Sequence, residues 1–124
     1  ATKGLADPAY LAAREKARRL AGAEGIDALM REHRLDAIVA PSGSPAWTSD
    51  TVLGDHFVGG SSTLAAVAGY PNITVPMGAV RGLPVGLSIF GAAWSEARLI
   101  GIAYAFEQRT KARKPPLYLP TLPD

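Results

Sequence analysis

The sequence has 124 residues, of which 48% are hydrophobic and 19% charged, with a net charge of +2 and no cysteine. This balance excludes an intrinsically disordered chain, and the small net charge gives no indication of a nucleic-acid partner. The absence of cysteine excludes disulfides, a thiol nucleophile and a cysteine-bound metal. No apolar run approaches the roughly 20 residues of a membrane span, and no signal peptide begins the chain. We therefore expect one domain over residues 1–124 and no membrane partner; the compartment is not fixed, with the cytoplasm favoured.

The first third of the chain has a helical pattern. Asp7 followed by Pro8 is typical of a helix start, with Asp as the N-cap and Pro in the first turn. Gly22 and Gly25 interrupt the pattern, so either one long helix tolerates two glycines or two helices meet near Gly22. His33 falls near the end of this pattern, where we expect a surface or capping role.

A short apolar segment, Leu35–Ala40, predicts a buried strand that ends at Pro41. Residues 42–60 have no periodicity and predict a long loop, which in a compact domain usually carries function or is disordered. The small apolar residues from Gly60 to Ala68 predict a tightly packed helix that begins at Ser61 or Ser62.

Two apolar runs, Asn72–Gly78 and Val85–Phe90, are bounded by Gly and Pro and predict a hairpin of strands buried on both faces. Pro76 cannot donate a ladder hydrogen bond, so we expect a strand end or a bulge there. A helix should follow from Ser95 to about Lys111, and its wide apolar surface predicts that it is well buried. The order of elements predicts an α/β fold, with a small mixed sheet flanked by helices.

A local serine-histidine-aspartate set could be assembled from Ser61, Ser62, Asp55 and His56. The structural alternative is stronger, because triads are assembled from separate elements and no G-x-S-x-G turn is present. In that alternative the serines cap a helix and His56 bonds within a loop. We expect no cofactor and no metal site, since His33 and His56 lie far apart and no paired acidic motif occurs.

Several strings in order resemble the C-terminal part of amidase-signature enzymes: LDAIVAPSGSPAW, GDHFVGGSS, AGYPNITVPMG, GLPVGLSIFG, SEARLIGIAYAFEQRT and PPLYLPTL. GDHFVGGSS before AGYP looks most like the branch that includes peptide amidases. The resemblance implies an acyl-enzyme reaction that uses a serine nucleophile, a second serine and a lysine base. In that family these residues precede everything matched here, so no catalytic residue is carried over to this chain.

The resemblance further implies that the loop and the helix start shape a substrate cleft. The substrate-binding candidates are Trp47, Asp55, His56, Phe57, Ser61 and Ser62. An aromatic and polar mixture suits a pocket that packs an apolar group and orients an amide. The implied substrate is a small amide or a peptide amide.

The leading hypothesis is therefore a C-terminal fragment of an amidase-signature amide hydrolase that lacks the Ser-Ser-Lys residues. The alternative is a standalone, non-catalytic α/β module with a binding or structural role. The missing N-terminal region of the amidase is the implied partner. Strand edges left unpaired by its absence predict self-association of the chain.

Overall fold

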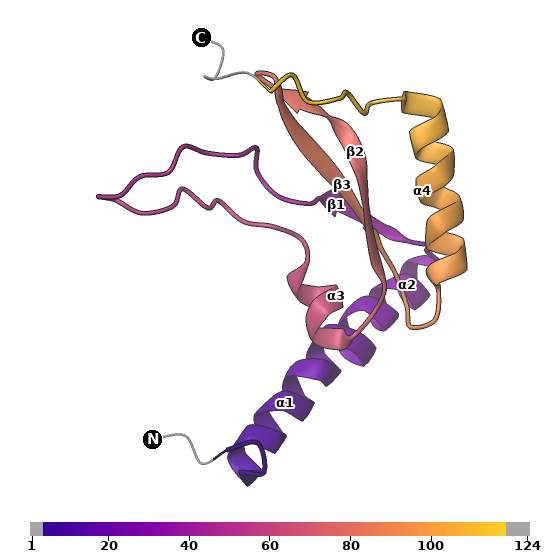
Figure 1. Ribbon diagram of the computed structural model, residues 1–124. Helices are drawn as coiled ribbons and strands as arrows, with labels where there is room; N and C mark the ends of the chain where they lie inside the picture. Colours follow the sequence, from indigo (N-terminus) through magenta and orange to yellow (C-terminus); the bar gives the residue numbers. More distant parts are fainter. Residues whose placement is uncertain (1–3, 119–124) are drawn as a thin grey trace.

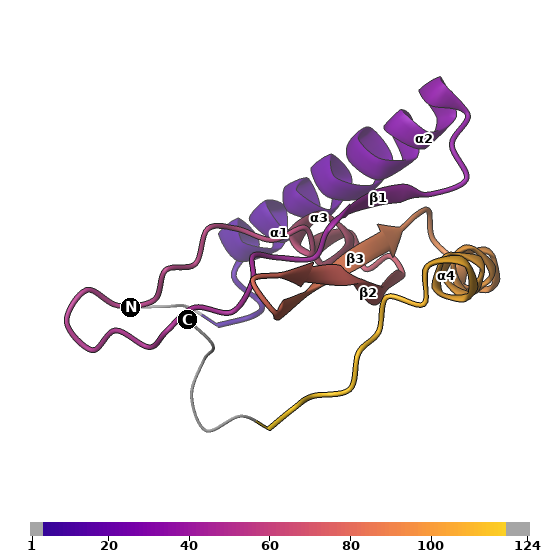
Figure 2. The ribbon, with the colours of Figure 1, turned by 90° about the horizontal axis from the view of Figure 1, so that it is seen from above.

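Helices cover both faces of a three-stranded sheet (Figures 1 and 2). The computed structural model describes residues 4–118. Along the chain the elements are α1 (Pro8–Ala21), the π-helical turn η1 (Gly22–Ile26), α2 (Asp27–His33), β1 (Ile38–Pro41), α3 (Thr63–Ala68), β2 (Asn72–Val80), β3 (Leu83–Phe90) and α4 (Glu96–Thr110). The predicted α/β arrangement with a small sheet is confirmed.

The helical segment begins as predicted, because the Asp7 side chain accepts a hydrogen bond of 2.8 Å from the Ala9 backbone N–H. The glycines do not end this helix. They form the π-helical turn η1 that joins α1 to α2, so the segment is one long helix with a joint. A Cβ on Gly25 would lie 2.6 Å from the Leu20 carbonyl oxygen, and the turn therefore needs glycine at this position. No helix among residues 4–118 combines the length and the apolarity needed to cross a bilayer.

The sheet has the order β1-β3-β2, and both pairings are antiparallel. The sequence had predicted a mixed sheet, and this prediction is wrong for the described residues, where every strand pair is antiparallel. The hairpin turn consists of Arg81 and Gly82, with φ values of 51° and 81°, which is the two-residue turn whose twist suits a hairpin. The predicted irregularity at Pro76 is confirmed as a shift of register between Pro76 and Gly78.

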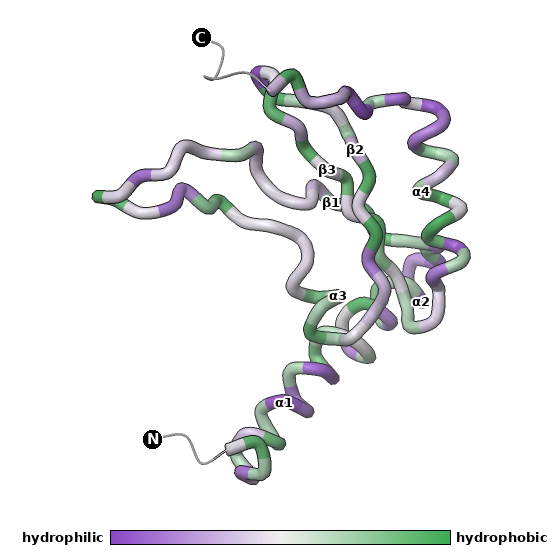
Figure 3. The backbone as a smooth tube through the Cα atoms, in the orientation of Figure 1, coloured by the Kyte–Doolittle hydropathy of each residue, from purple (hydrophilic) through white to green (hydrophobic). Residues whose placement is uncertain are grey.

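Two apolar clusters fill the space on the two faces of the sheet. Ile26 and Phe90 belong to the cluster beneath α1, η1 and α3, whereas Ile89 and Leu99 belong to the cluster beneath α4. The prediction that both hairpin strands are buried on both faces is wrong for β2, where only Val75 is buried. Figure 3 shows the alternation of hydrophobic and hydrophilic segments along the chain.

The expected burial of the last helix is also wrong in part. Leu99 and Ala103 are buried, but Ile100 and Tyr104 are 58% and 63% exposed. The reason is that α4 contacts the sheet along one stripe, while its apolar residues extend around more of the helix than that stripe covers.

Residues 42–62, which we call the arm, leave the sheet after β1 and return to α3 (Figures 1 and 2). The arm has the irregular backbone that the sequence predicts. Its base is tied to β3, because the Ser42 N–H donates to the Gly86 carbonyl at 2.8 Å. Gly43 and Gly60 form an isolated antiparallel bridge between the part of the arm that leaves β1 and the part that returns to α3. The base of the arm is therefore fixed to the sheet, while its turn at residues 51–53 lies far from it.

Candidate functional site

Three of the predicted substrate-binding residues come together in the arm. The Trp47 indole N–H donates to a carboxylate oxygen of Asp55 at 3.2 Å. The rings of Trp47 and Phe57 meet edge to face, with centroids 6.0 Å apart, a favourable arrangement for aromatic pairs. Phe57 remains 66% exposed and Trp47 39% exposed. Beyond the Gly43–Gly60 bridge at its base, the arm is thus held together by one polar and one aromatic contact at Trp47, and part of the aromatic surface stays exposed.

His56 takes a different partner from the one that a local triad would need. Its Nε2 lies 3.8 Å from a carboxylate oxygen of Asp50. The other Asp50 oxygen accepts from the backbone N–H groups of Val52 and Leu53 at 2.8 and 2.9 Å. The Leu53 and Val52 N–H groups hold the pKa of Asp50 below its ordinary value of 3.8, and His56 adds a smaller contribution in the same direction. Asp50 therefore shapes the turn of the arm and positions His56 beside it.

Ser61 and Ser62 lie at the base of the arm, where α3 begins. Ser62 occupies the N-cap position, but its side chain makes no capping hydrogen bond, so the predicted side-chain cap is wrong. The backbone of Ser62 is already helical, with φ −75° and ψ −23°, whereas a capping side chain needs an extended backbone. The Ser61 hydroxyl is buried and has no partner among residues 4–118.

The described residues do not assemble a catalytic triad. Among residues 4–118 no hydrogen bond joins Ser61 or Ser62 to His56, and Asp55 pairs with Trp47 instead. A serine nucleophile needs a base within hydrogen-bond reach. The arm therefore offers aromatic surface and carboxylate acceptors, but no activated serine.

A cluster of three hydroxyls beneath the arm was missed by the sequence analysis. Ser42 and Ser88 have their oxygens 2.8 Å apart, and each lies 3.3 Å from the hydroxyl of Thr74. Ser88 is only 2% exposed. A Cβ on Gly86 would lie 2.7 Å from the Thr74 methyl and 2.9 Å from the Ser42 hydroxyl. The cluster thus needs a glycine beside it, and it fixes the base of the arm to β2 and β3.

The cluster left a signal in the sequence. Thr74 and Ser88 are the hydroxyl residues inside two otherwise apolar strand segments, and Ser42 follows the third. Single polar residues in apolar strands require partners once buried. That these three hydroxyls lie together could have been predicted only from the register of the strands, in which Ser88 pairs with both Thr74 and Ala40.

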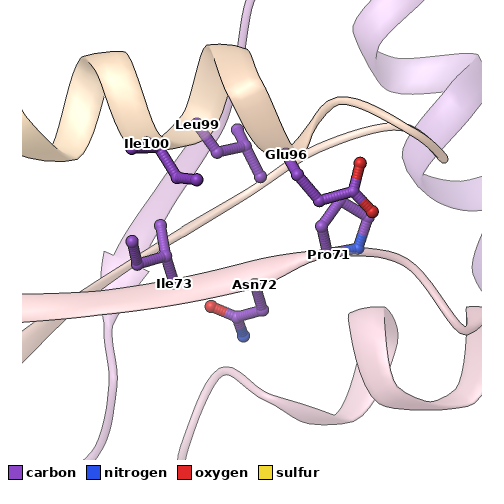
Figure 4. A pocket seen from close by; sticks show the side chains of 6 residues that line it. All are labelled: Pro71, Asn72, Ile73, Glu96, Leu99 and Ile100. Atoms are coloured by element: carbon purple, nitrogen blue, oxygen red, sulfur yellow. The ribbon is translucent and has the colours of Figure 1, made fainter.

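A groove of about 260 Å³ lies between the start of β2 and the first turns of α4 (Figure 4). It is lined by Pro71, Asn72, Ile73, Glu96, Leu99 and Ile100. Figure 4 shows Ile73 pointing toward the helix and Asn72 pointing to the opposite side of the strand. Within residues 4–118, no three acidic or histidine side chains gather as a cation site.

The comparisons with known proteins agree on one family. The sequence model of the family described as Amidase matches residues 2–100. The chain therefore belongs to the amidase family, as the resemblance had implied.

Peptide amidases are among the similar solved structures. The peptide amidase of Stenotrophomonas maltophilia has 60% sequence identity and a TM-score of 0.85, covering 95% of this chain and 23% of that chain. A peptide amidase in complex with the competitive inhibitor chymostatin has 61% identity and a TM-score of 0.91, covering 95% of this chain and 24% of that one.

A relative from Arabidopsis thaliana, named a probable amidase, is 42% identical over 96 residues, which are 77% of this chain and 16% of the relative. The chain thus spans no more than a quarter of the length of these relatives.

Proposed function

We propose that this chain is the C-terminal portion of an amide hydrolase that acts on peptide amides or small amides. The observation that carries the proposal is the 60–61% identity and the TM-scores of 0.85 and 0.91 to peptide amidases over 95% of the chain. In the proposal residues 1–124 form one structural unit. The remainder of the amidase is its partner and supplies the serine nucleophile, the second serine and the lysine base.

Within that enzyme we assign the arm to the wall of the substrate cleft. Trp47 and Phe57 present exposed aromatic surface, and Asp55 orients the Trp47 ring through its hydrogen bond. Aromatic surface beside a few placed polar groups is typical of small-molecule sites. His56 and Asp50 shape the turn, while Ser61 and Ser62 lie where the arm joins α3. In this proposal the two serines contribute to the cleft by positioning the arm, and they do not act as nucleophiles.

A chimera tests the function. Residues 4–118 of this chain would replace the matching part of the Stenotrophomonas maltophilia peptide amidase, and hydrolysis of a peptide amide would be measured. At 60% identity we expect the chimera to fold and to retain activity. A chimera that folds with a native unfolding transition but hydrolyses no amide would contradict the proposal and favour the alternative, a non-catalytic module.

The role of the arm is tested in the same chimera with Trp47→Ala. We expect a higher inhibition constant for chymostatin and a higher KM, with a smaller change in kcat, because a residue that packs substrate contributes mainly to binding. Leu11→Ala on α1 is the matched control, since this exposed leucine lies on a different element. Equal inhibition constants for chymostatin in the Trp47→Ala and Leu11→Ala variants would show that Trp47 is not part of the cleft wall.

We also propose that the chain by itself associates with a second copy. Both edge strands, β1 and β2, lack a partner on their outer side among residues 4–118. Ile100 and Tyr104 on α4 are more than half exposed, and exposed apolar surface beside an open strand edge favours association.

A further inference from the structure

Three hydroxyl groups at the base of the arm form a closed ring. The Ser42 hydroxyl donates to the Thr74 hydroxyl at 3.3 Å. The oxygens of Thr74 and Ser88 are also 3.3 Å apart, and those of Ser88 and Ser42 are 2.8 Å apart. With Thr74 donating to Ser88 and Ser88 donating to Ser42, every hydroxyl donates once and accepts once. Each member of this hydroxyl ring thus has both of its partners inside the ring.

Ser88 is the buried anchor of the hydroxyl ring. It is 2% exposed, and it pairs with Ala40 on β1 and with Thr74 on β2. Ser42 and Thr74 are less buried. Hydrogen bonds in such a network strengthen one another where water is excluded. Loss of the Ser88 hydroxyl therefore opens the ring at its most buried point and leaves Ser42 with only its longer bond to Thr74.

Ser42 also holds the part of the arm that returns to α3. Its carbonyl accepts a hydrogen bond from the Ser61 N–H at 3.3 Å, beside the bridge between Gly43 and Gly60. A Cβ on Gly60 would lie 3.0 Å from the Ser42 carbonyl oxygen and 3.7 Å from the Phe57 ring. The Phe57 ring therefore lies close to the bridge, and the position of Ser42 decides where this ring is held.

We propose that Ser88 is a positioning residue for substrate binding, which acts through Ser42 on the aromatic pair of Trp47 and Phe57. The inference rests on the proposed function, in which this pair belongs to the cleft wall. The two rings meet with centroids 6.0 Å apart, so a displacement of Phe57 also affects Trp47. In this proposal Ser88 does not touch the substrate.

The advantage of a held arm lies in the entropy of binding. A binding surface that is already ordered loses less conformational freedom when the substrate binds. An arm released from the hydroxyl ring would take more positions and would have to be ordered by the substrate. A ring with a purely structural role would lower the stability of the fold without changing the affinity for substrate, and this difference separates the two roles.

Amide hydrogen exchange of the 124-residue chain tests the first step, from Ser88 to the arm. The Ser61 N–H reports on the base of the arm, because it bonds to the Ser42 carbonyl. The Leu99 N–H bonds to the Ser95 carbonyl at 3.1 Å and reports on the rest of the fold. In Ser88→Ala we expect exchange at Ser61 to accelerate about three- to tenfold more than exchange at Leu99. Equal acceleration at the two amides would overturn the proposal.

The chimera with the Stenotrophomonas maltophilia peptide amidase tests the second step, from the arm to binding. Ser88→Ala should raise the KM for a peptide amide and the inhibition constant of chymostatin about three- to tenfold. The value of kcat should change less than about twofold, because Ser88 supports binding and not the chemical step. The double variant Ser88→Ala/Trp47→Ala should have the inhibition constant of Trp47→Ala alone, because residues that act through one another are not additive.

Two further variants control for stability and for folding. Asp7→Ala removes the cap of α1, which accepts from the Ala9 N–H at 2.8 Å, and so destabilises the fold far from the arm along the chain. We expect it to leave the inhibition constant of chymostatin unchanged. Ser42→Ala removes the contact with Ser88 from the less buried side, and we expect the same effects as for Ser88→Ala. It carries the test if Ser88→Ala does not fold.

The outcomes separate this inference from the proposed function. A folded wild-type chimera that hydrolyses no amide overturns the proposed function and, with it, the role of Ser88 in binding. An active chimera in which neither Ser88→Ala nor Ser42→Ala changes the inhibition constant overturns this inference alone. Additive effects of Ser88→Ala and Trp47→Ala would likewise overturn it, because they would show that Ser88 does not act through the aromatic pair.

Discussion

The hydroxyl oxygens of Ser42 and Ser88 lie 2.8 Å apart, although 46 positions separate them in the chain. Through this contact the first residue of the arm is held to the buried C-terminal part of β3. The cluster therefore links the stability of the sheet to the position of the residues that we assign to the cleft.

Ser88→Ala should lower the free energy of unfolding by about 1–2 kcal/mol, because it removes two hydrogen bonds from a buried site. It should also speed proteolytic cleavage in the arm near Val52 and Leu53, which are 88% and 80% exposed. Urea unfolding and limited proteolysis provide the two readouts. Ser44→Ala is the control: the Ser44 hydroxyl is buried without a partner among residues 4–118, so its loss should cost nothing. Equal effects of the two substitutions would show that the cluster does not stabilise the fold.

Tyr70, in the segment between α3 and β2, makes a pH-dependent contact with the start of α2. Its hydroxyl donates to a carboxylate oxygen of Asp27 at 2.6 Å. This hydrogen bond, with partial burial and the charge of Asp27, raises the pKa of Tyr70 above its ordinary value of 10.0. A raised pKa means that the folded state binds the proton more tightly. The contribution to stability is therefore complete below the ordinary value and is lost as the pH rises through the raised one.

We expect Tyr70→Phe to be about 1 kcal/mol less stable than the wild type near neutral pH. The difference should shrink at strongly alkaline pH, where the wild type loses the same hydrogen bond. Denaturant unfolding of both proteins across this range measures it. A difference that stays constant from neutral to strongly alkaline pH would contradict the role of the Tyr70 proton.

The sequence was sufficient for the features that local chemistry decides. Asp7 and Pro8 predicted the helix start, and Pro76 predicted the bulge, because each residue restricts its own backbone. Contacts between residues far apart in the chain could not be predicted from the sequence. Whether Ser88 meets Ser42 depends on the order of the strands, and the expected mixed sheet gave no register from which to infer it.

The errors at the candidate site have a similar cause. Ser62 has the right residue type and place for a cap, but the backbone that enters α3 from the arm is already helical there. Asp55 and His56 are neighbours in sequence, yet they face different partners, Trp47 and Asp50. Residue types predicted an aromatic and polar loop correctly, but only the fold of the arm decides which side chains meet.

Gly25→Ala should be more destabilising than Gly22→Ala. At Gly25 the added Cβ meets the Leu20 carbonyl at 2.6 Å, and backbone cannot move without opening the π-helical turn. We expect a loss of about 1–3 kcal/mol. At Gly22 the added Cβ meets the Tyr70 hydroxyl at 3.1 Å, and the helix preference of alanine offsets part of the cost. Thermal unfolding of the two variants shows which substitution is the more destabilising. A larger loss of stability for Gly22→Ala would contradict this account of the turn.

This chain alone should not hydrolyse amides. Amide hydrolysis requires a nucleophile, a base within reach and an oxyanion site held in one geometry. Within residues 4–118, Ser61 has no partner and His56 pairs with Asp50, so neither serine at the base of the arm is activated. The described lysines, Lys16, Lys111 and Lys114, are exposed, so none of them has the apolar surroundings in which a lysine serves as a catalytic base.

The assay would use the chain purified free of host amidases, with primary amides and peptide amides as substrates. We expect the rate to equal that of a variant in which Asp55, His56, Ser61 and Ser62 are all alanine. A serine-directed phosphonate should likewise fail to label Ser61 or Ser62. Turnover by the wild-type chain that disappears in the quadruple variant would show that the arm rearranges in solution into a local triad. That result would move the nucleophile into this chain and remove the need for the rest of an amidase.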